Sequence, residues 1–178
     1  QTAIRLFAEL GYHATTMRML GRELGMTAPS LYNHYTEKQD ILFDIAYNTM
    51  LTLLEGGRRA VEKNDDPEGQ FRGFLASHVE FHAERRLEAQ VADNQLQALE
   101  PERRGKVVAV RDRYERLLVE ILVRGRDEAG WKVDDASVIA FGIFTMGTGT
   151  ATWFDDGGRL SASEVARIYG DFCLAAFT

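Results

Sequence analysis

One short stretch of the chain concentrates side chains that can hydrogen-bond to phosphates and to the edges of nucleic-acid bases. From Thr16 to Lys38 the sequence carries hydroxyl, amide, imidazole and basic groups in close succession. Hydroxyl and cationic groups bind phosphate oxygens, an asparagine amide pairs with adenine, and small apolar groups contact a thymine methyl. The candidate DNA contacts are Thr16, Arg18, Thr27, Ala28, Pro29, Ser30, Tyr32, Asn33, His34, Tyr35 and Lys38.

The same stretch has the pattern of two short helices joined by a tight turn. Thr16 and Thr27 stand where each helix begins, and a threonine hydroxyl can accept a bond from an unpaired N–H of the first turn. Gly25 stands where the first helix ends, and glycine reaches the positive φ of a helix terminus without steric cost. Pro29 falls in the first turn of the second helix, where it removes no needed bond. The pattern predicts a helix-turn-helix, whose second helix enters the major groove.

The letters L-Y-N-H-Y-T-E-K at residues 31–38, preceded by G-Y-H-A-T-T at residues 11–16, resemble the TetR family of transcriptional repressors. The resemblance is strongest over residues 3–50. It implies that a glycine-aromatic pair ends the first helix and that a threonine opens the second. It also implies that tyrosine, histidine and a second aromatic residue close the recognition helix, and that Lys38 opens a fourth helix.

Each of these side chains also has a structural explanation. Thr16 and Thr27 can be helix caps only, Tyr35 can belong to the core, and Lys38 can be a solvated charge. Residues 1–60 hold six basic and six acidic side chains, and the whole chain carries −6. Since DNA-binding domains are usually basic, we expect local positive charge at the contact helices and a further basic segment ahead of Gln1.

Composition and pattern predict an all-α protein. Hydrophobic residues make up 45% of the chain, prolines number three, and strand-like alternation is absent from the sequence. We expect an N-terminal three-helix, helix-turn-helix DNA-binding head over residues 1–45. A C-terminal helical bundle for ligand binding and dimerisation should follow over residues 46–178. The predicted helices after the head cover residues 37–59, 67 onward with a weak point near 85–86, 101–129, 137–154 and 160–177.

The last two predicted helices have the composition of an interface. Residues 137–154 are apolar nearly all round and rich in small side chains, and such a helix must be buried on several sides. Together with residues 160–177 they predict a homodimer surface, which the family resemblance describes as a four-helix bundle. A symmetric dimer would read a palindromic double-stranded DNA operator. The alternative is that both helices bury against the chain's own body.

The family resemblance also implies a small-molecule effector that releases the DNA. For each candidate ligand-binding residue, plain core packing is the alternative. His78 and His82 stand four residues apart and could share a metal ion, but the sequence supplies no evident third ligand, so we predict no metal site. The candidates are Phe74, His78, Phe81, His82, Asn94, Arg113, Tyr114, Leu117, Phe141, Phe144 and Trp153.

A second resemblance concerns the kind of effector. The letters T-A-T-W-F-D-D-G-G-R-L-S-A-S-E-V-A-R-I-Y at residues 150–169 are similar to TetR-type regulators of fatty-acid, phenylacetate and sterol catabolism. Those regulators respond to acyl-CoA thioesters. The resemblance implies an apolar tunnel for an acyl chain and arginines near the CoA phosphates, namely Arg111, Arg113, Arg159 or Arg167.

The sequence argues against several other classes. No nucleophile has an evident catalytic partner, and the glycines of residues 147–150 lie in an apolar helix without the lysine of a nucleotide loop. We therefore expect neither an enzyme nor a cofactor. No membrane span is evident, and Cys173 alone cannot form an intrachain disulfide. The leading hypothesis is a cytoplasmic, homodimeric, ligand-responsive repressor. The alternative is a helical binding or scaffold module that responds to a non-CoA hydrophobic ligand or has lost DNA binding.

Overall fold

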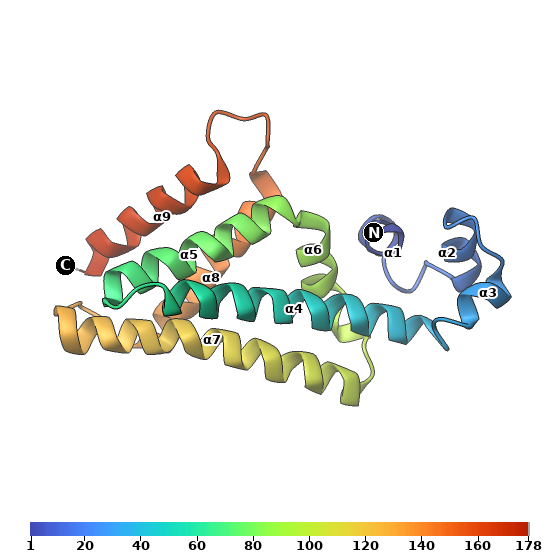
Figure 1. Ribbon diagram of the computed structural model, residues 1–178, viewed down its shortest axis with the longest axis horizontal. Helices are drawn as coiled ribbons and strands as arrows, with labels where there is room; N and C mark the ends of the chain where they lie inside the picture. The colour runs from blue at the N-terminus through green and yellow to red at the C-terminus, as the bar shows by residue number, and fades with distance from the viewer. Residues whose placement is uncertain (178) are drawn as a thin grey trace. The chain divides into compact units, whose positions relative to one another are not determined.

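The computed structural model describes residues 1–177 and, of Ala28, the backbone alone. Every regular element of these residues is a helix, so the predicted all-α class is confirmed (Figure 1). The elements are α1 (Thr2–Leu10), α2 (Met17–Glu23), α3 (Ala28–Tyr32), α4 (Lys38–Glu62), α5 (Pro67–Glu84), α6 (Arg86–Asn94), the 3-10 turn η1 (Leu96–Ala98), α7 (Pro101–Ala129), α8 (Ala136–Trp153) and α9 (Ala162–Phe177).

The chain forms two compact units. The head unit consists of Gln1–Leu51 with Leu87–Val110, and the body unit consists of Thr52–Arg86 with Arg111–Thr178. Helices α4 and α7 each contribute residues to both units. The boundary predicted at residue 45 from the sequence remains a prediction.

The predicted caps of the helix-turn-helix are confirmed. The Thr16 hydroxyl accepts a hydrogen bond from the Met19 amide at 3.2 Å, and the Thr27 hydroxyl accepts one from the Ser30 amide at 3.3 Å. Gly25 has a φ of +64°, which only glycine adopts easily. Helix α3 is five residues long and therefore shorter than the two turns expected, because Asn33 already stands at its C-cap.

The head unit is held together by apolar side chains from its four N-terminal helices. Phe7 of α1, Leu20 of α2, Leu31 of α3 and Leu42 of α4 are all buried. Burial of each such side chain contributes roughly 1.5–3 kcal/mol. Since α3 is too short to be stable by itself, its orientation depends on Leu31 in this core.

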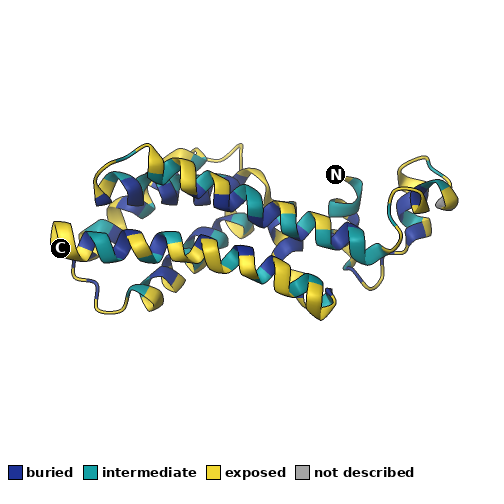
Figure 2. Cartoon of the chain, turned by 60° about the horizontal axis from the view of Figure 1, so that its bottom comes forward, coloured by how far each residue is buried: buried dark blue, intermediate teal, exposed yellow. Residues whose placement is uncertain are grey.

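In the body unit, α5 packs against both α8 and α9 (Figure 1). Asp66 caps α5 through the Gly69 amide, and Asp135 caps α8 through the amides of the next turn. Figure 2 shows that the buried residues lie along the inner sides of the helices. The helix that begins at residue 67 was predicted to have a weak point near residues 85–86. It does end there, because Arg85 has a non-helical backbone between α5 and α6.

The predicted capping box at the start of the last helix is also confirmed. The Glu164 amide donates to the Ser161 hydroxyl at 3.3 Å, and the Ser161 amide donates to the Glu164 carboxylate at 2.8 Å. These two bonds satisfy amides that a helix N-terminus leaves unpaired. The apolar side of α9 is thereby fixed against α5.

Candidate nucleic-acid interface and effector site

The helix-turn-helix exposes the polar residues that the sequence singled out. Ser30 is half-buried, and the side chain of Ala28 lies outside the part of the chain that the structure describes. The exposed candidates are Thr16, Arg18, Thr27, Pro29, Tyr32, Asn33 and His34. The two helices therefore present hydroxyl, amide, imidazole and guanidinium groups to solvent from one short segment. This is the arrangement needed for phosphate contacts around a helix that reads base edges.

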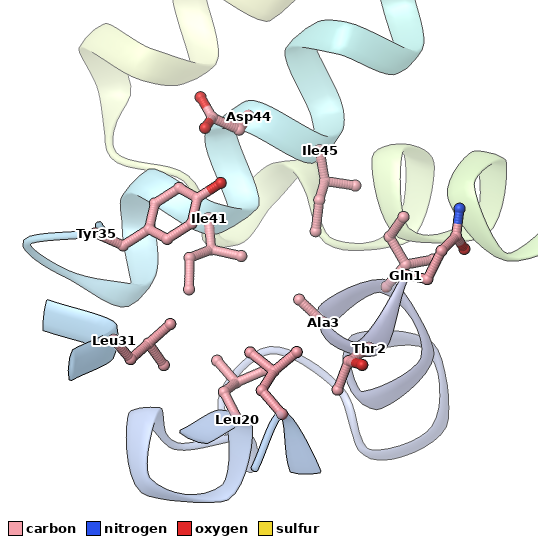
Figure 3. Close-up of a pocket in the computed structure, with 11 residues that line it drawn as sticks. Gln1, Thr2, Ala3, Leu20, Leu31, Tyr35, Ile41, Asp44 and Ile45 are labelled. Atoms are coloured by element: carbon pink, nitrogen blue, oxygen red, sulfur yellow. The ribbon is translucent and has the colours of Figure 1, made fainter. Parts of the chain in front are cut away.

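Beneath these residues lies a cavity of about 220 Å³ within the head unit. Figure 3 shows its apolar wall, to which Leu20, Leu31 and Ile41 contribute, with Tyr35 and Asp44 beside them. The sequence did not predict this cavity, because it depends on how α1, α2, α3 and α4 pack together. Its lining side chains hold the recognition helix from its inner side.

Tyr35 differs from the prediction that it donates to phosphate. Its ring lines the cavity, and burial together with the charge and hydrogen bond of Asp44 raises the pKa of its hydroxyl. A phosphate contact would have to replace the bond to Asp44. The half-buried position of Tyr35 fits the alternative explanation, a role in the core, and its contact with DNA stays a prediction.

Lys38 is not the solvated charge that was the alternative to a DNA contact. Its ammonium donates to the carbonyls of Tyr12 and Thr15, each at 2.6 Å, and lies 4.0 Å from the centroid of the Tyr12 ring. Partial burial lowers the pKa of Lys38. The first turn of α4 is thereby tied to the loop that precedes α2. An ammonium has three donors, so one remains for a phosphate.

Gln39 forms a connection that the sequence analysis missed. Its amide nitrogen donates to the Tyr12 hydroxyl at 2.9 Å and to the Ala98 carbonyl at 2.7 Å. Its amide oxygen accepts from the Glu100 amide at 3.1 Å. One side chain therefore joins three segments of the head unit, and no local pattern in the sequence could have revealed partners so far apart along the chain.

Arg103 adds charged contacts to the same connection. Its guanidinium donates to the carboxylates of Glu37 and Asp40, both at 2.6 Å. Charge-assisted bonds of this kind are stronger than neutral ones. Together with Gln39, they fix the start of α4 to the start of α7 inside the head unit.

In the body unit, four of the predicted effector residues come together. His78 Nδ1 lies 3.1 Å from the Tyr114 hydroxyl, and its Nε2 lies 3.4 Å from the Phe144 carbonyl. The Phe74 and Tyr114 rings stack with centroids 5.0 Å apart, and Phe144 packs edge-on against Phe74. The result is a buried aromatic cluster with a polar centre, which is the usual lining of a small-molecule site.

The two histidines of this region are neutral. Burial, assisted by the neighbouring His82, lowers the pKa of His78 to about 3, and burial lowers the pKa of His82 to about 4. Their rings meet edge to face with centroids 4.5 Å apart. Burial also raises the pKa of Tyr114 far above its usual range. The cluster therefore offers neutral hydrogen-bonding groups and no charge to a ligand.

Two predicted effector residues do not face the interior of the body unit. Phe141 is 74% exposed and Trp153 is 53% exposed, so the prediction that they face inward is wrong. Helix α8 buries Ala140 and Ile143, among others, which places both aromatic side chains on the opposite face. Because this helix is apolar nearly all round, the sequence pattern could not tell its inner face from its outer one.

Four further predicted effector residues differ in burial and in the unit to which they belong. Asn94 is exposed and belongs to the head unit, and Arg113 is exposed on α7. Phe81 is buried with the Arg85 guanidinium 5.7 Å from its ring centroid. Leu117 is half-buried. Phe81 also meets the His82 ring edge to face, with centroids 5.7 Å apart.

Helices α8 and α9 of the body unit expose large apolar side chains. We call this set the α8/α9 apolar face. It comprises Val138, Phe141, Trp153, Ile168 and Phe172, whose exposed fractions run from 41% to 74%. Soluble chains rarely leave so many large apolar groups in water unless a partner covers them.

Two further features bear on the kind of protein. Nowhere in residues 1–177 do three His, Cys, Asp or Glu side chains gather as ligands for a metal ion. None of the helices described over the same residues has the length and apolarity required to cross a membrane.

The capped helix-turn-helix and the helical body that follows it place this chain in the class of helical regulatory proteins. The chain belongs to the TetR family: residues 1–45 match the model for bacterial regulatory proteins of the tetR family, and residues 64–177 match a tetracyclin repressor-like C-terminal domain.

Named relatives extend over nearly the whole chain. The HTH-type transcriptional repressor KstR2 of Mycobacterium tuberculosis is 23% identical, over 100% of this chain and 90% of its own length. The TetR family transcriptional regulator PfmR of Thermus thermophilus is 32% identical, with a TM-score of 0.90 over 99% of this chain and 97% of its own. AibR, solved with isovaleryl coenzyme A and operator DNA, is 23% identical, with a TM-score of 0.84 over 97% of this chain and 94% of its own.

Proposed function

We propose that the protein is a homodimeric transcriptional repressor that binds a palindromic operator through α3 and leaves it when an acyl-CoA thioester occupies the body unit. The observation that carries the proposal is the helix-turn-helix itself. Leu31 is buried while Asn33 and Tyr32 of the same short segment are exposed. The core therefore fixes a helix whose outer side offers polar groups suited to base edges.

The dimer is supported by the α8/α9 apolar face. Covering Phe141 and Phe172, which are 74% and 68% exposed, removes a large apolar area from water. A two-fold axis through this face would bring two heads to two half-sites of one operator.

The effector is supported by the buried cluster around His78, Tyr114 and Phe144. A ligand releases DNA only if it binds one conformation of the protein better than the other. Helices α4 and α7 contribute residues to both units, so a change in the body unit can reach the head unit through continuous helices. A thioester is favoured because AibR, of the same fold, is known with isovaleryl coenzyme A and operator DNA.

The test is fluorescence anisotropy of the full-length protein on DNA from upstream of its own gene, titrated with a panel of acyl-CoA thioesters. We expect nanomolar to micromolar binding that weakens steeply with salt, and release by a thioester but not by free CoA or the free acid. Tight binding that no thioester disturbs would support the proposal that the protein is a repressor and exclude an acyl-CoA thioester as its effector.

A scaffold module without DNA binding is the second candidate, and the charge balance of residues 1–60 favours it. Affinity that is equal for upstream and random DNA, with little dependence on salt, would support the scaffold. A preference of at least about a thousandfold for one palindromic site would exclude it.

A further inference from the structure

Two polar atoms in the body unit are buried without a hydrogen-bonding partner. They are Nδ1 of His82 and the hydroxyl oxygen of Thr150, on residues that are 3% and 0% exposed. Buried polar groups in folded proteins are nearly always paired, because leaving one unpaired is costly. Two such groups in one unit therefore call for a functional explanation.

Two contacts on either side of these residues show how α5 and α8 are aligned. At one end, a Cβ on Gly147 would collide with the His78 ring. At the other end, Arg86 donates to the Phe154 carbonyl at 2.8 Å. Along the chain, His82 lies between His78 and Arg86, and Thr150 lies between Gly147 and Phe154. Because α5 packs along α8 (Figure 1), this order along the two helices leads us to place His82 and Thr150 at corresponding positions of the interface.

The neighbouring turn is different, because its histidine is satisfied. Both ring nitrogens of His78 have partners, the Tyr114 hydroxyl and the Phe144 carbonyl. One turn further along α5, the ring of His82 has an unpaired nitrogen, and Thr150 on α8 has an unpaired hydroxyl. Of these two histidines on α5, His78 thus has a partner for each ring nitrogen, whereas Nδ1 of His82 has no partner.

We propose that His82 and Thr150 together bind one oxygen atom, a hydroxyl or a keto group, on the part of the effector that enters the body unit. This inference rests on the proposed function. A ligand hydroxyl would accept from the Thr150 hydroxyl and donate to Nδ1 of His82. A keto oxygen would accept from Thr150 and from the other His82 tautomer, which carries its proton on Nδ1. The effector class is therefore an acyl thioester oxygenated along its chain, and a plain saturated chain binds less tightly.

Binding at these atoms would also act on α8. Both atoms are enclosed, so a ligand must separate α5 from α8 to reach them. Helix α8 carries Thr150 on its inner side and Phe141 and Trp153 on the α8/α9 apolar face. A ligand oxygen between α5 and α8 would therefore shift the same helix that forms the proposed dimer surface.

The experiment compares matched probes on the full-length protein. Octanoyl-CoA, 3-hydroxyoctanoyl-CoA, 3-oxooctanoyl-CoA and 8-hydroxyoctanoyl-CoA are titrated into the DNA complex, and their binding to the free protein is measured by thermal shift. We expect at least one oxygenated member to act at a concentration tenfold or more below octanoyl-CoA. In Thr150→Val and in His82→Leu the ratio between the oxygenated probe and octanoyl-CoA should fall to about one. Thr150→Ser keeps a hydroxyl and should keep the wild-type ratio. Thr145→Val, at an exposed threonine of the same helix, should not alter the ratio either.

The unliganded variants give a readout that needs no ligand. If the Thr150 hydroxyl has no structural partner, Thr150→Val should melt at the same temperature as the wild-type protein or higher, since an unpaired polar group is replaced by an apolar group of the same shape. A fall of several degrees would show a structural role for the hydroxyl and overturn the inference.

The outcomes separate the two proposals. Release of DNA by octanoyl-CoA and its oxygenated partners at equal concentrations overturns the oxygen site and leaves the thioester repressor standing. Oxygenated probes that shift the melting temperature of the wild-type protein but not of Thr150→Val support the oxygen site even if no probe releases DNA. The absence of a shift with every probe overturns it.

Discussion

Lys38 lies over Tyr12, with its ammonium 4.0 Å from the ring centroid and 2.6 Å from the carbonyl of the same residue. A second bond of 2.6 Å reaches the Thr15 carbonyl. The loop between α1 and α2 ends at Thr16, whose hydroxyl caps α2. The lysine therefore holds in place the backbone that sets the direction of the first helix of the helix-turn-helix.

Replacing this lysine should affect folding and DNA binding together. Lys38→Met removes both carbonyl bonds, and we expect a loss of about 1–2 kcal/mol in unfolding free energy by urea titration. DNA affinity at low salt should fall by about tenfold or more. Arg18→Met is the control, because Arg18 is exposed and, among the residues that the structure describes, no hydrogen bond or ion pair joins it to the loop. It should lower affinity without a change in stability; equal stability of both variants would contradict the structural role of Lys38.

Local signals in the sequence were sufficient for the helix-turn-helix and failed for its long-range contacts. The Thr16 and Thr27 caps depend on the next three residues, so their hydroxyls and the following pattern predicted them. The bonds of Lys38 and Gln39 join residues 23 to 61 positions apart. Such partners follow from tertiary packing, which a single sequence does not display.

Helix α8 shows a different limit. Its inner face was not predictable, since apolar residues occupy nearly every position and periodicity has no polar side to use as a reference. Phe141 and Trp153 were expected inside and are exposed, whereas Thr150, a polar residue, is buried. Phe74 and His78 of α5 lie inside, as expected, whereas their role in effector binding stays a prediction.

The neutral histidines of the body unit predict acid sensitivity. The pKa of His78 is about 3 and that of His82 about 4, both below the usual 6.5. The unfolded chain therefore binds more protons than the native protein below pH 6.5, so stability is full above that pH and falls as the pH drops toward the native values. From pH 7 to pH 5 we expect a loss of about 1–2 kcal/mol for each histidine.

Urea titrations at pH 7, 6 and 5 measure this slope. His82→Leu should show roughly half the pH dependence of the wild-type protein, because one of the two titrating groups is gone. Thr145 is exposed and does not titrate, so Thr145→Val serves as the control and should keep the full slope. An unchanged slope in His82→Leu would show that other groups cause the acid sensitivity.

Gln39 should couple the head unit to its α7 segment. Gln39→Leu removes the bonds to Tyr12, Ala98 and Glu100, and we expect a loss of about 1–2 kcal/mol in stability. If the connection carries the effector signal, DNA affinity without effector should change less than threefold, while the effector concentration needed for release should rise. Gln39→Glu keeps the acceptor for the Glu100 amide but loses both donors, so it should fall between the wild-type protein and Gln39→Leu. Full release of Gln39→Leu at the wild-type effector concentration would contradict the coupling.

Charge placed on the α8/α9 apolar face should separate the proposed dimer. Phe172→Glu introduces a carboxylate at a side chain that is 68% exposed in the single chain. The fold should therefore survive, whereas burying this charge in a dimer would be costly. We expect the dimer dissociation constant to rise at least a hundredfold by sedimentation equilibrium. Arg116→Glu, at an exposed position on α7, should leave the dimer intact. A dimer unaffected by Phe172→Glu would place the interface elsewhere.

Asn33 should contribute to the choice of DNA sequence, whereas Leu31 should contribute to stability. Asn33 is exposed at the C-cap of α3, and its amide can pair with an adenine edge. Asn33→Ala should weaken binding to the preferred operator by about 1–3 kcal/mol and reduce discrimination at one base pair of each half-site. Leu31→Ala removes a side chain that is 3% exposed, so it should lower stability by about 2–5 kcal/mol. Anisotropy on operators with single substitutions, at a temperature where both variants are folded, separates the two effects. If Asn33→Ala weakens binding equally on all operators, its amide contacts the phosphate backbone and another residue of α3 reads the bases.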